Sequence, residues 1–210
     1  MTPRQNYQKM LERKLAQLQS EGRTPRLLLH ACCAPCSSYV LEYLSEYFNI
    51  TLFYYNPNIT DPQEYRKRVD EVQRLIAELP VRNKISFLEG EYEPRAFTQV
   101  AKGLENEPEG GARCEKCFRL RLERSAQAAA QMAEECGEEV LLTTTLTISP
   151  LKNAELLNSI GQEMAGRYEG IAWLDSDFKK RGGYLRSIEL SRQYGLYRQD
   201  YCGCVYSRRK

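Results

Sequence analysis

Cysteine is the residue type in this sequence with the clearest capacity for chemistry. The chain of 210 residues holds eight cysteines and a single histidine, His30. Thiols that stay reduced inside cells usually bind metal or carry out redox chemistry, and one histidine excludes the common catalytic zinc sites that need two or three. Cys136 stands alone, as a buried structural cysteine would. The other seven form three groups: Cys32, Cys33 and Cys36; Cys114 and Cys117; Cys202 and Cys204.

The first two groups have the spacing of metal-binding turns. Cys32, Cys33 and Cys36 follow a short apolar run, and the helix expected after them would stabilise thiolates through its positive N-terminal end. Cys114 and Cys117 repeat the C-x-x-C spacing at a second predicted helix start. Together the two turns offer up to five thiolates, which favours an iron–sulfur cluster, most simply a cubane held by four sulfurs. A four-cysteine zinc site is the alternative, but the 77 residues between Cys36 and Cys114 are long for a zinc ribbon.

The segment Cys202-Gly203-Cys204 is a different kind of motif. Two cysteines separated by one residue do not chelate one metal ion as a C-x-x-C turn does. They can form a strained disulfide that is easily reduced, or they can give sulfur ligands to a second iron beside the cluster. The motif is weak alone, and it gains weight from the other two groups.

Strands alternate with helices along the chain. Apolar runs rich in β-branched and aromatic residues predict five strands, helical periodicity predicts seven helices, and the acidic, glycine-rich segment 104–113 predicts a mobile loop. The strands are expected at 27–31, 50–55, 85–88, 140–146 and 171–174, and the helices at 7–20, 37–48, 61–79, 95–102, 114–136, 153–165 and 184–194. This alternation predicts an α/β fold with a mainly parallel sheet and helices on both faces. Such sheets bind ligands at the carboxyl ends of strands, and Cys32 lies just past the first one.

Composition and charge narrow the class of protein. Hydrophobic residues make up 42% and charged residues 28% of the chain, near the globular average. No apolar run is long enough for a transmembrane helix, and the polar N-terminus lacks the apolar core of a signal peptide, so a cytoplasmic protein without membrane contact is expected. The net charge is +4 over residues 1–26, −9 over 27–178 and +7 over 179–210. The basic last segment predicts an anionic partner.

Several motifs, in order from about Leu27 to Ser207, resemble the QueH type of epoxyqueuosine reductase. They are His30-Ala31-Cys32-Cys33-Ala34-Pro35-Cys36, Cys114-x-x-Cys117, Thr144-Thr145-Leu146 with Ser149-Pro150-x-Lys152, Asp177-Phe178-Lys179-Lys180 and the run from Leu196 to Ser207. The first 26 residues lie outside these motifs. The resemblance therefore implies an N-terminal helical extension at 1–26 and a single α/β catalytic domain at 27–210.

The resemblance implies the last step of queuosine biosynthesis in tRNA. In that step, a two-electron reduction removes the epoxide oxygen of epoxyqueuosine at the wobble position of tRNAs with GUN anticodons, which leaves queuosine. A [4Fe-4S] cluster and an additional non-haem iron are implied, without cobalamin, together with an electron donor of ferredoxin or flavodoxin type. The implied fold is Rossmann-like (HUP/PP-loop-like), similar to the nucleotide-binding domains of tRNA-modifying ATP pyrophosphatases. The glycine-rich phosphate loop of those relatives is absent here, which argues against ATP use.

Carried onto this sequence, the resemblance implies Cys32, Cys33, Cys114 and Cys117 as the cluster ligands. A set in which Cys36 takes the place of Cys33, with Cys33 on the second iron, fits the motif nearly as well. Some relatives carry aspartate at the Cys36 position. Since both side chains ligate iron, Cys36 keeps a metal-binding role in either case.

The remaining candidates follow from the implied reaction. Cys202 and Cys204 are either a redox pair or ligands of the second iron. His30 is either a donor to a cluster sulfur or a satisfied core histidine. Removal of the epoxide oxygen as water takes two electrons and two protons, so the site needs an acid. The candidate acids are Asp177, Lys152 and Tyr201.

The last segment also predicts contact with RNA. Single-stranded RNA is bound by aromatic stacking and by cations on phosphates, and this segment interleaves tyrosines with arginines. The RNA-binding candidates are Arg186, Arg192, Arg198, Arg208 and Arg209. Two rival hypotheses remain: a zinc-stabilised RNA-binding module without catalysis, and a thiol–disulfide oxidoreductase that acts through Cys202 and Cys204.

Overall fold

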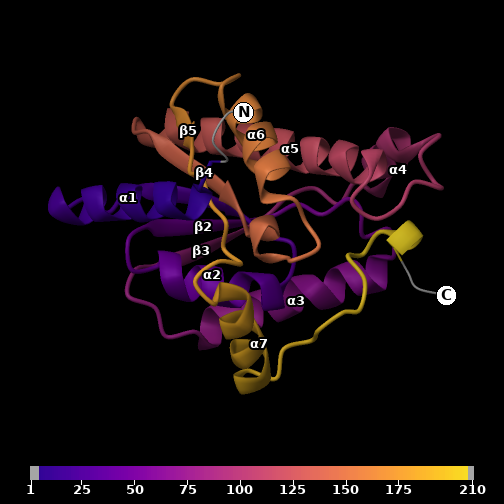
Figure 1. The fold of residues 1–210 in the computed structure, drawn as a ribbon, viewed down its shortest axis with the longest axis horizontal. Coiled ribbons are helices and arrows are strands. Elements are labelled where there is room, and N and C mark those ends of the chain that lie inside the picture. Colours follow the sequence, from indigo (N-terminus) through magenta and orange to yellow (C-terminus); the bar gives the residue numbers. More distant parts are fainter. Residues whose placement is uncertain (1–4, 208–210) are drawn as a thin grey trace.

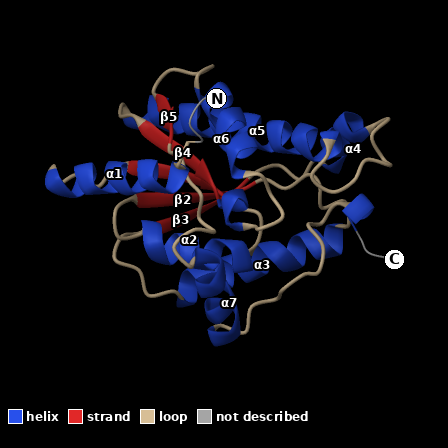
Figure 2. Cartoon of the chain, in the orientation of Figure 1, coloured by secondary structure: helices blue, strands red, loops and turns tan. Residues whose placement is uncertain are grey.

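The computed structural model describes residues 5–207 and shows an α/β fold around one sheet (Figures 1 and 2). The strands are β1 (Arg26–His30), β2 (Asn49–Tyr54), β3 (Ile85–Glu89), β4 (Val140–Thr144) and β5 (Ile171–Trp173). Neighbouring strands are parallel throughout, in the order β3-β2-β1-β4-β5. The helices are α1 (Tyr7–Ser20), α2 (Ala34–Leu44), α3 (Pro62–Glu78), α4 (Pro94–Ala101), α5 (Ala112–Cys136), α6 (Ala154–Ala165) and α7 (Gly183–Gln193), with 3-10 helices η1 (Thr145–Ile148) and η2 (Val205–Ser207). The predicted Rossmann-like α/β fold is confirmed.

Strand β1 lies at the centre of the sheet and is buried on both sides. Successive side chains of a strand point to opposite faces, so Leu27 and Leu29 join one hydrophobic cluster while Leu28 joins the other. The first cluster includes the apolar faces of α1, α2 and α3, and the second includes those of α5 and α6. Burial on both faces explains why β1 is a continuous apolar run in the sequence.

The connections leave β1 and β4 toward opposite faces of the sheet. Strand β1 continues into α2, which packs in the first cluster, and β4 continues through η1 into α6, which packs in the second. The carboxyl ends of these adjacent strands therefore border the point where strand order reverses, at which open α/β sheets bind ligands. Cys32 follows β1 and Thr145 follows β4, so both lie at this point.

Helix α2 begins earlier than the sequence suggested. It starts at Ala34 rather than near residue 37, and Cys33 is its N-cap. Proline is compatible with the first positions of a helix, so Pro35 permits the early start. The Ser37 amide then donates to the Cys33 carbonyl at 3.1 Å. Cys36 consequently lies inside the first helical turn rather than in a loop before it.

Two further segments differ from the prediction. Strand β4 ends at Thr144 rather than at residue 146, because the Thr144 side chain accepts a hydrogen bond from the Leu146 amide and starts η1. Segment 104–113, expected to be a mobile loop, is bound to the start of α5. The Arg113 guanidinium donates to three of its carbonyl oxygens at 2.6, 2.9 and 3.0 Å.

Helix α1 packs on the same sheet as the following elements. Leu11, Leu15 and Leu18 recur at the spacing of one helix face, and each is at most 2% exposed. They join the cluster that contains α2 and α3. The predicted boundary at residue 26 falls at the first residue of β1, and the division into an extension and a catalytic domain stays a prediction. None of the helices within residues 5–207 is long and apolar enough to cross a membrane.

Residues 194–207 run back over the molecule after α7, and we call this segment the C-terminal strap. It leaves α7 near α2, passes along α3 and ends in η2 (Figure 1). The strap carries Cys202 to the edge of the sheet where β1 ends, because Cys202 lines one cavity together with Cys33 and Cys36. The strap therefore brings Cys202 to the same cavity as Cys33 and Cys36, although these residues are far apart in the sequence.

Candidate metal centre

The first cysteine group forms a compact set of sulfur atoms at the end of β1. The Sγ atoms of Cys32, Cys33 and Cys36 all lie within 4.8 Å of one another, and those of Cys32 and Cys33 are 3.8 Å apart. The early start of α2 produces this arrangement, since the Ser37 hydroxyl also donates to the Cys33 carbonyl, at 2.8 Å. Local backbone structure therefore gathers the three thiols at the positive end of a helix.

Thr145, the first residue of η1 after strand β4, makes two hydrogen bonds to Cys32. Its Oγ1 accepts a hydrogen bond from the Cys32 amide at 3.2 Å, and its hydroxyl donates to the Cys32 Sγ at 3.4 Å. A hydroxyl can do both because it has one proton and two lone pairs. A hydrogen bond donated to a thiolate stabilises the charged form, so Thr145 favours ionised Cys32.

The three thiols of this group differ in acidity. Hydrogen bonds from the Cys33 and Cys36 thiols, followed by the charges of Arg121 and Lys152, hold the pKa of Cys32 well below its ordinary value. The hydrogen bond to Cys32 raises the pKa of Cys33 to about 12 and that of Cys36 well above its ordinary value. The group by itself holds one thiolate and two thiols, and a bound metal ion would displace the remaining protons.

The second cysteine group lies in the first turns of α5. Cys114, Cys117 and Arg121 share one helix face because they are spaced three and four residues apart. They line a cavity of about 160 Å³ together with Cys202 and Cys204 of the strap. Burial raises the pKa of Cys117 to about 11, an effect that the Arg121 charge partly offsets. Four thiols and two guanidinium groups, those of Arg113 and Arg121, thus line this cavity.

Side chains from α3 and the loop before it hold the strap in place. The Asn58 amide donates to the Cys202 carbonyl at 3.0 Å. The Arg68 guanidinium donates to the Tyr201 carbonyl at 3.5 Å and lies over the Tyr201 ring, 5.2 Å from its centroid. Arg68 is 2% exposed and pairs with Glu64 at 2.7 Å. A buried, charge-balanced arginine therefore supports the cysteine segment of the strap.

Gly203 permits the sharp turn between the two strap cysteines. Its φ of +96° is in the left-handed region that favours glycine, and a Cβ there would lie 2.5 Å from Ile59. Within this turn, hydrogen bonds from Cys204 and then Ser207 hold the pKa of Cys202 well below its ordinary value, while that of Cys204 is raised by its hydrogen bond to Cys202. All eight cysteines are free in this structure, and a disulfide between Cys202 and Cys204 stays a prediction.

A second cavity, of about 190 Å³, connects the first cysteine group to the strap. Cys33, Cys36, Cys202, Lys152 and Tyr201 contribute to its wall. Cys202 and Lys152 also line the cavity of the second cysteine group, so the two cavities adjoin at these residues. Within residues 5–207, only the first group places three potential metal ligands within 4.8 Å of one another. One four-cysteine site drawn from both groups therefore stays a prediction.

Lys152 is the cation at this junction. Burial lowers the pKa of Lys152, but the electrostatic effect of the nearby cysteines, Cys32 first, raises it by more, so the net shift is upward. Its ammonium group, 3.5 Å from the Ser149 hydroxyl, is protonated at neutral pH. Lys152 therefore supplies a permanent positive charge beside the sulfur atoms.

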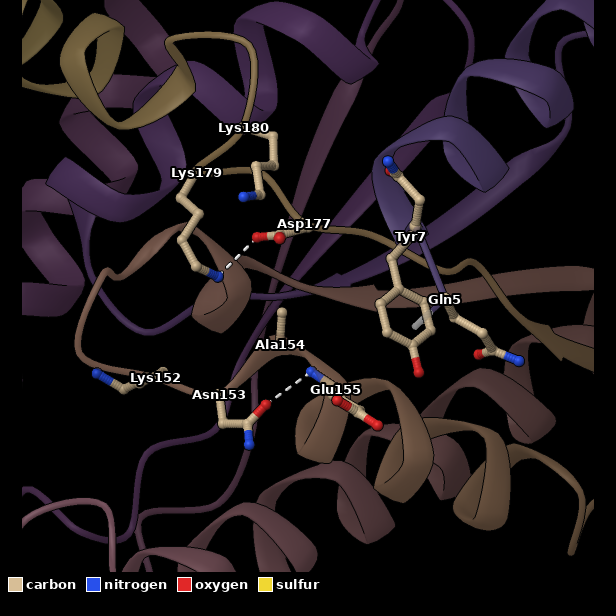
Figure 3. A pocket seen from close by; sticks show the side chains of 10 residues that line it. Gln5, Tyr7, Lys152, Asn153, Ala154, Glu155, Asp177, Lys179 and Lys180 are labelled. Carbon is tan, nitrogen blue, oxygen red and sulfur yellow. Dashed lines mark hydrogen bonds and ion pairs between the residues drawn. The ribbon is translucent and has the colours of Figure 1, made fainter. Parts of the chain in front are cut away.

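Asp177 lies in a different cavity from the thiols. This cavity, of about 410 Å³, has Lys152, Lys179 and Lys180 on its wall, with Tyr7 on the opposite side (Figure 3). Asp177 pairs with Lys179 at 2.6 Å. Asp177 is thus in an ion pair outside the thiol-lined cavities, and it shares a cavity with Lys152 but not with Tyr201. Lys152 lines all three cavities.

The predicted RNA-binding arginines are dispersed over the surface. Arg186 of α7 pairs with Glu42 at 2.7 Å and with Glu189 at 3.1 Å. Arg192 is exposed in the last turn of α7. Arg198 is exposed on the wall of the cavity that connects the first cysteine group to the strap. Two of the predicted residues lie outside the described part of the chain: Arg208 and Arg209.

A buried polar network that sequence reasoning missed lies beneath the cysteines. Arg121 donates to His30 Nε2 at 3.3 Å and to Asn56 Oδ1, and Asn56 donates to the Ala31 carbonyl at 2.9 Å. A guanidinium can only donate, so His30 Nε2 accepts in its contact with Arg121. Nε2 also lies 3.3 Å from the Tyr55 carbonyl oxygen, and Nδ1 lies 2.8 Å from the Thr144 hydroxyl. Burial and then the Arg121 charge lower the pKa of His30 to about 3. His30 is therefore a neutral core histidine with both ring nitrogens engaged, not a donor to sulfur.

Two sequence signals pointed toward this network. Arg121 follows Cys117 by four residues, the spacing of neighbours on one helix face. Thr144 and Thr145 lie near the end of the strand predicted at 140–146, and strand ends are where this architecture places its site. Asn56 likewise follows the strand predicted at 50–55, but its hydrogen bond to the Ala31 carbonyl depends on β2 pairing with β1.

The donor set of the first group suits a thiophilic metal. Two thiolates on one tetrahedral ion with bonds of about 2.3 Å are about 3.8 Å apart, which is the separation between Cys32 and Cys33. Soft thiolates favour zinc, copper(I) and iron–sulfur clusters over hard cations. The group of Cys32, Cys33 and Cys36 can therefore bind such a metal.

Comparison with known proteins identifies the family. Residues 27–210 match the family described as Epoxyqueuosine reductase QueH. A curated protein of that name from Staphylococcus epidermidis is 41% identical over 209 residues, which span 98% of this chain and 85% of the relative. Relatives of the same name from Streptococcus pyogenes and Acinetobacter baylyi are 40% and 42% identical, over 99% and 88% of this chain and 80% and 81% of their own lengths. The chain therefore belongs to the QueH family of epoxyqueuosine reductases, as its motifs predicted.

Proposed function

We propose that this protein reduces the epoxide of epoxyqueuosine at the wobble position of tRNA to give queuosine. The observation that carries the proposal is the convergence of three cysteine groups at the switch point of the sheet, in a chain of this family. Its curated relatives are named for this activity. The reaction removes one oxygen atom as water, so it consumes two electrons and two protons.

The cysteines supply the ligands of the proposed redox centre. Cys32, Cys33, Cys114 and Cys117 would hold a [4Fe-4S] cluster which, with an additional non-haem iron and no cobalamin, supplies the electrons. The short distance between the Cys32 and Cys33 sulfur atoms and the lowered pKa of Cys32 support a metal at the first group, because thiolate is the form that binds metal. The thiols left for the additional iron, or for a redox pair in the strap, are Cys36, Cys202 and Cys204.

Lys152 and Tyr201 are the groups best placed to act on the departing oxygen. Both line the cavity that joins the first cysteine group to the strap. The Lys152 charge would stabilise negative charge as it develops on the oxygen, and the Tyr201 hydroxyl would donate a proton. Asp177 would act at a distance, by positioning Lys179 in the neighbouring cavity.

The RNA would approach over the carboxyl edge of the sheet. Lys152, Lys179 and Lys180 line the cavity beside the thiols (Figure 3). Leu151, which is 66% exposed, lies at the rim shared by the two thiol-lined cavities. Cations bind phosphates and exposed apolar groups contact unstacked bases. We assign the phosphate contacts to these lysines and to Arg198, rather than to the ion-paired arginine of α7.

An anaerobic assay tests the proposed activity. The purified protein is incubated with a chemical reductant and with epoxyqueuosine-containing tRNA that carries a GUN anticodon. The nucleoside is then read by mass spectrometry, and a product that has lost one oxygen atom is expected. An iron-loaded protein that leaves the nucleoside unchanged would contradict the proposal. In the cytoplasm the reductant would be replaced by a ferredoxin- or flavodoxin-like donor.

The two rival functions give different results on anaerobic purification. The proposed reductase is expected to be brown, with broad visible absorption. A colourless protein with stoichiometric zinc that binds tRNA without turnover would instead be an RNA-binding module. A colourless, metal-free protein with a titratable dithiol at Cys202 and Cys204 would be a thiol–disulfide oxidoreductase.

A further inference from the structure

Arg121 brings a buried positive charge to the thiol-lined cavity of α5. Its side chain lies one turn after Cys117, is 3% exposed, and lines the cavity that the second cysteine group shares with the strap. It donates hydrogen bonds to His30 and Asn56, and neither of these is charged. Among residues 5–207, no carboxylate forms an ion pair with it.

The two other buried arginines show how this protein balances such a charge elsewhere. Arg68 pairs with the carboxylate of Glu64 at 2.7 Å. Arg113, on the same helix as Arg121, donates to three backbone carbonyls. Moving a charge out of water is costly unless it is paired, and one imidazole and one amide do not neutralise a guanidinium. Among the described residues Arg121 has neither a carboxylate partner nor a set of carbonyls, so an anion in the cavity that it lines would balance its charge.

The sulfur atoms are the anions within its reach. Arg121 lines one cavity with the thiols of the second cysteine group and of the strap, Cys114, Cys117, Cys202 and Cys204. Arg113 and Lys152 line the same cavity, so three cations face these thiols. Among the described residues, the one carboxylate that lines this cavity, Glu109, is exposed, and solvent screens its charge.

We propose that Arg121 is the counter-charge of the metal–sulfur centre and that His30 and Asn56 hold it in position. The inference rests on the proposed function, since it assumes that the cysteines bind a redox metal. A cation beside such a centre stabilises the reduced form more than the oxidised form, because reduction adds a negative charge. Arg121 therefore raises the reduction potential.

The test compares Arg121→Gln and Arg121→Lys with the control Arg119→Gln. Arg119 lies on the same helix and pairs with Glu115 and Glu163 at the surface, so its replacement removes the same charge outside the thiol-lined cavities. Each protein is loaded with iron anaerobically and checked for folding by circular dichroism. Its iron content and midpoint potential are then measured by spectroelectrochemical titration. We expect Arg121→Gln to shift the potential to more negative values, with Arg121→Lys and Arg119→Gln close to wild type.

Each outcome decides for or against the counter-charge. An iron-loaded Arg121→Gln protein with the wild-type potential overturns the inference, and so does an Arg121→Lys shift as large as that of Arg121→Gln. A folded Arg121→Gln protein that loses iron while Arg121→Lys retains it supports the inference, whereas loss of iron from both variants overturns it. A wild-type protein that binds no iron overturns the proposed function itself, and this result is distinct from all the others.

Discussion

The first cysteine group and the C-terminal strap present thiols to the same site, but they are held by different means. The first group is placed by the end of β1, by the first turn of α2 and by the hydrogen bond that the Cys32 backbone amide donates to Thr145 in the connection after β4. Cys202 and Cys204 lie in a segment that has no helix or strand between α7 and η2. The first cysteine group is therefore formed together with the sheet, whereas the position of the strap depends on a few side-chain contacts.

One polar face of α3 supplies most of these contacts. The Tyr197 amide donates to Glu71 at 2.6 Å, and the Tyr197 hydroxyl donates to Glu64 at 3.2 Å. Arg74 donates to the Tyr194 carbonyl at 3.0 Å. Together with Arg68, these α3 residues are spaced three to four positions apart, so they lie on one helix face. The strap runs along α3 in Figure 1. Contacts of this kind can be removed one at a time without altering the sheet.

The largest expected effect is the loss of turnover in Cys33→Ser. The hydroxyl is nearly the same size as the thiol, but it does not replace a soft thiolate ligand. Turnover should fall by more than about 100-fold, while tRNA affinity in a binding assay stays unchanged. Cys136→Ser, at the far end of α5, is the matched control and should keep wild-type activity. Turnover of Cys33→Ser at a comparable rate would show that Cys33 is not a metal ligand.

Arg68→Met should release the strap while leaving the first cysteine group in place. Removal of one partner from a buried ion pair leaves Glu64 uncompensated and costs about 3–5 kcal/mol of unfolding free energy, measured by chemical denaturation. Turnover should fall with it, because Cys202 loses its support. The control Arg66→Met removes an exposed pair with Glu89, which is worth at most about 1 kcal/mol. Equal losses of unfolding free energy in Arg68→Met and Arg66→Met would show that the buried ion pair contributes no more to stability than the exposed one.

Gly203→Ala tests the strap by a smaller change. The alanine would meet Ile59 and would adopt a strained φ, at a cost of about 1–2 kcal/mol, and displacement of the thiols should lower turnover about tenfold. Gly22→Ala is the control, since Gly22 also has positive φ but has open space around it. Wild-type turnover in Gly203→Ala would show that the strap tolerates rearrangement without loss of function.

A change outside both cysteine regions should affect substrate binding alone. Lys180→Gln should weaken tRNA affinity about two- to fivefold and reduce the slope of log affinity against log salt by about one, as expected for one lost phosphate contact. Lys84→Gln, just before β3 at the opposite edge of the sheet, should have no effect. The affinity is measured over a series of salt concentrations. A wild-type affinity that does not vary with salt would remove the argument for phosphate contacts.

Local patterns explain which parts of the site could be predicted. The apolar run Leu27–Leu29, followed by cysteines and Pro35, correctly predicted a strand and, after it, a turn that gathers three thiols at the switch point. The start of α2 was misplaced by three residues, because the pattern did not show that Cys33 would act as the N-cap. Asp177 was grouped with the chemistry because its motif matched the family, but its ion pair with Lys179 holds it in another cavity.

By itself, the sequence determined the order of the elements, the place of the first cysteine group and the family, because each depends on residues close together in the chain. Only the tertiary structure decided that Cys202 contacts Asn58, 144 positions away, and that Thr145 binds Cys32, 113 positions away. The same packing placed Arg121 among the thiols. Such contacts depend on how α3, α5 and the strap pack against the sheet, and short-range spacing carries no record of that packing.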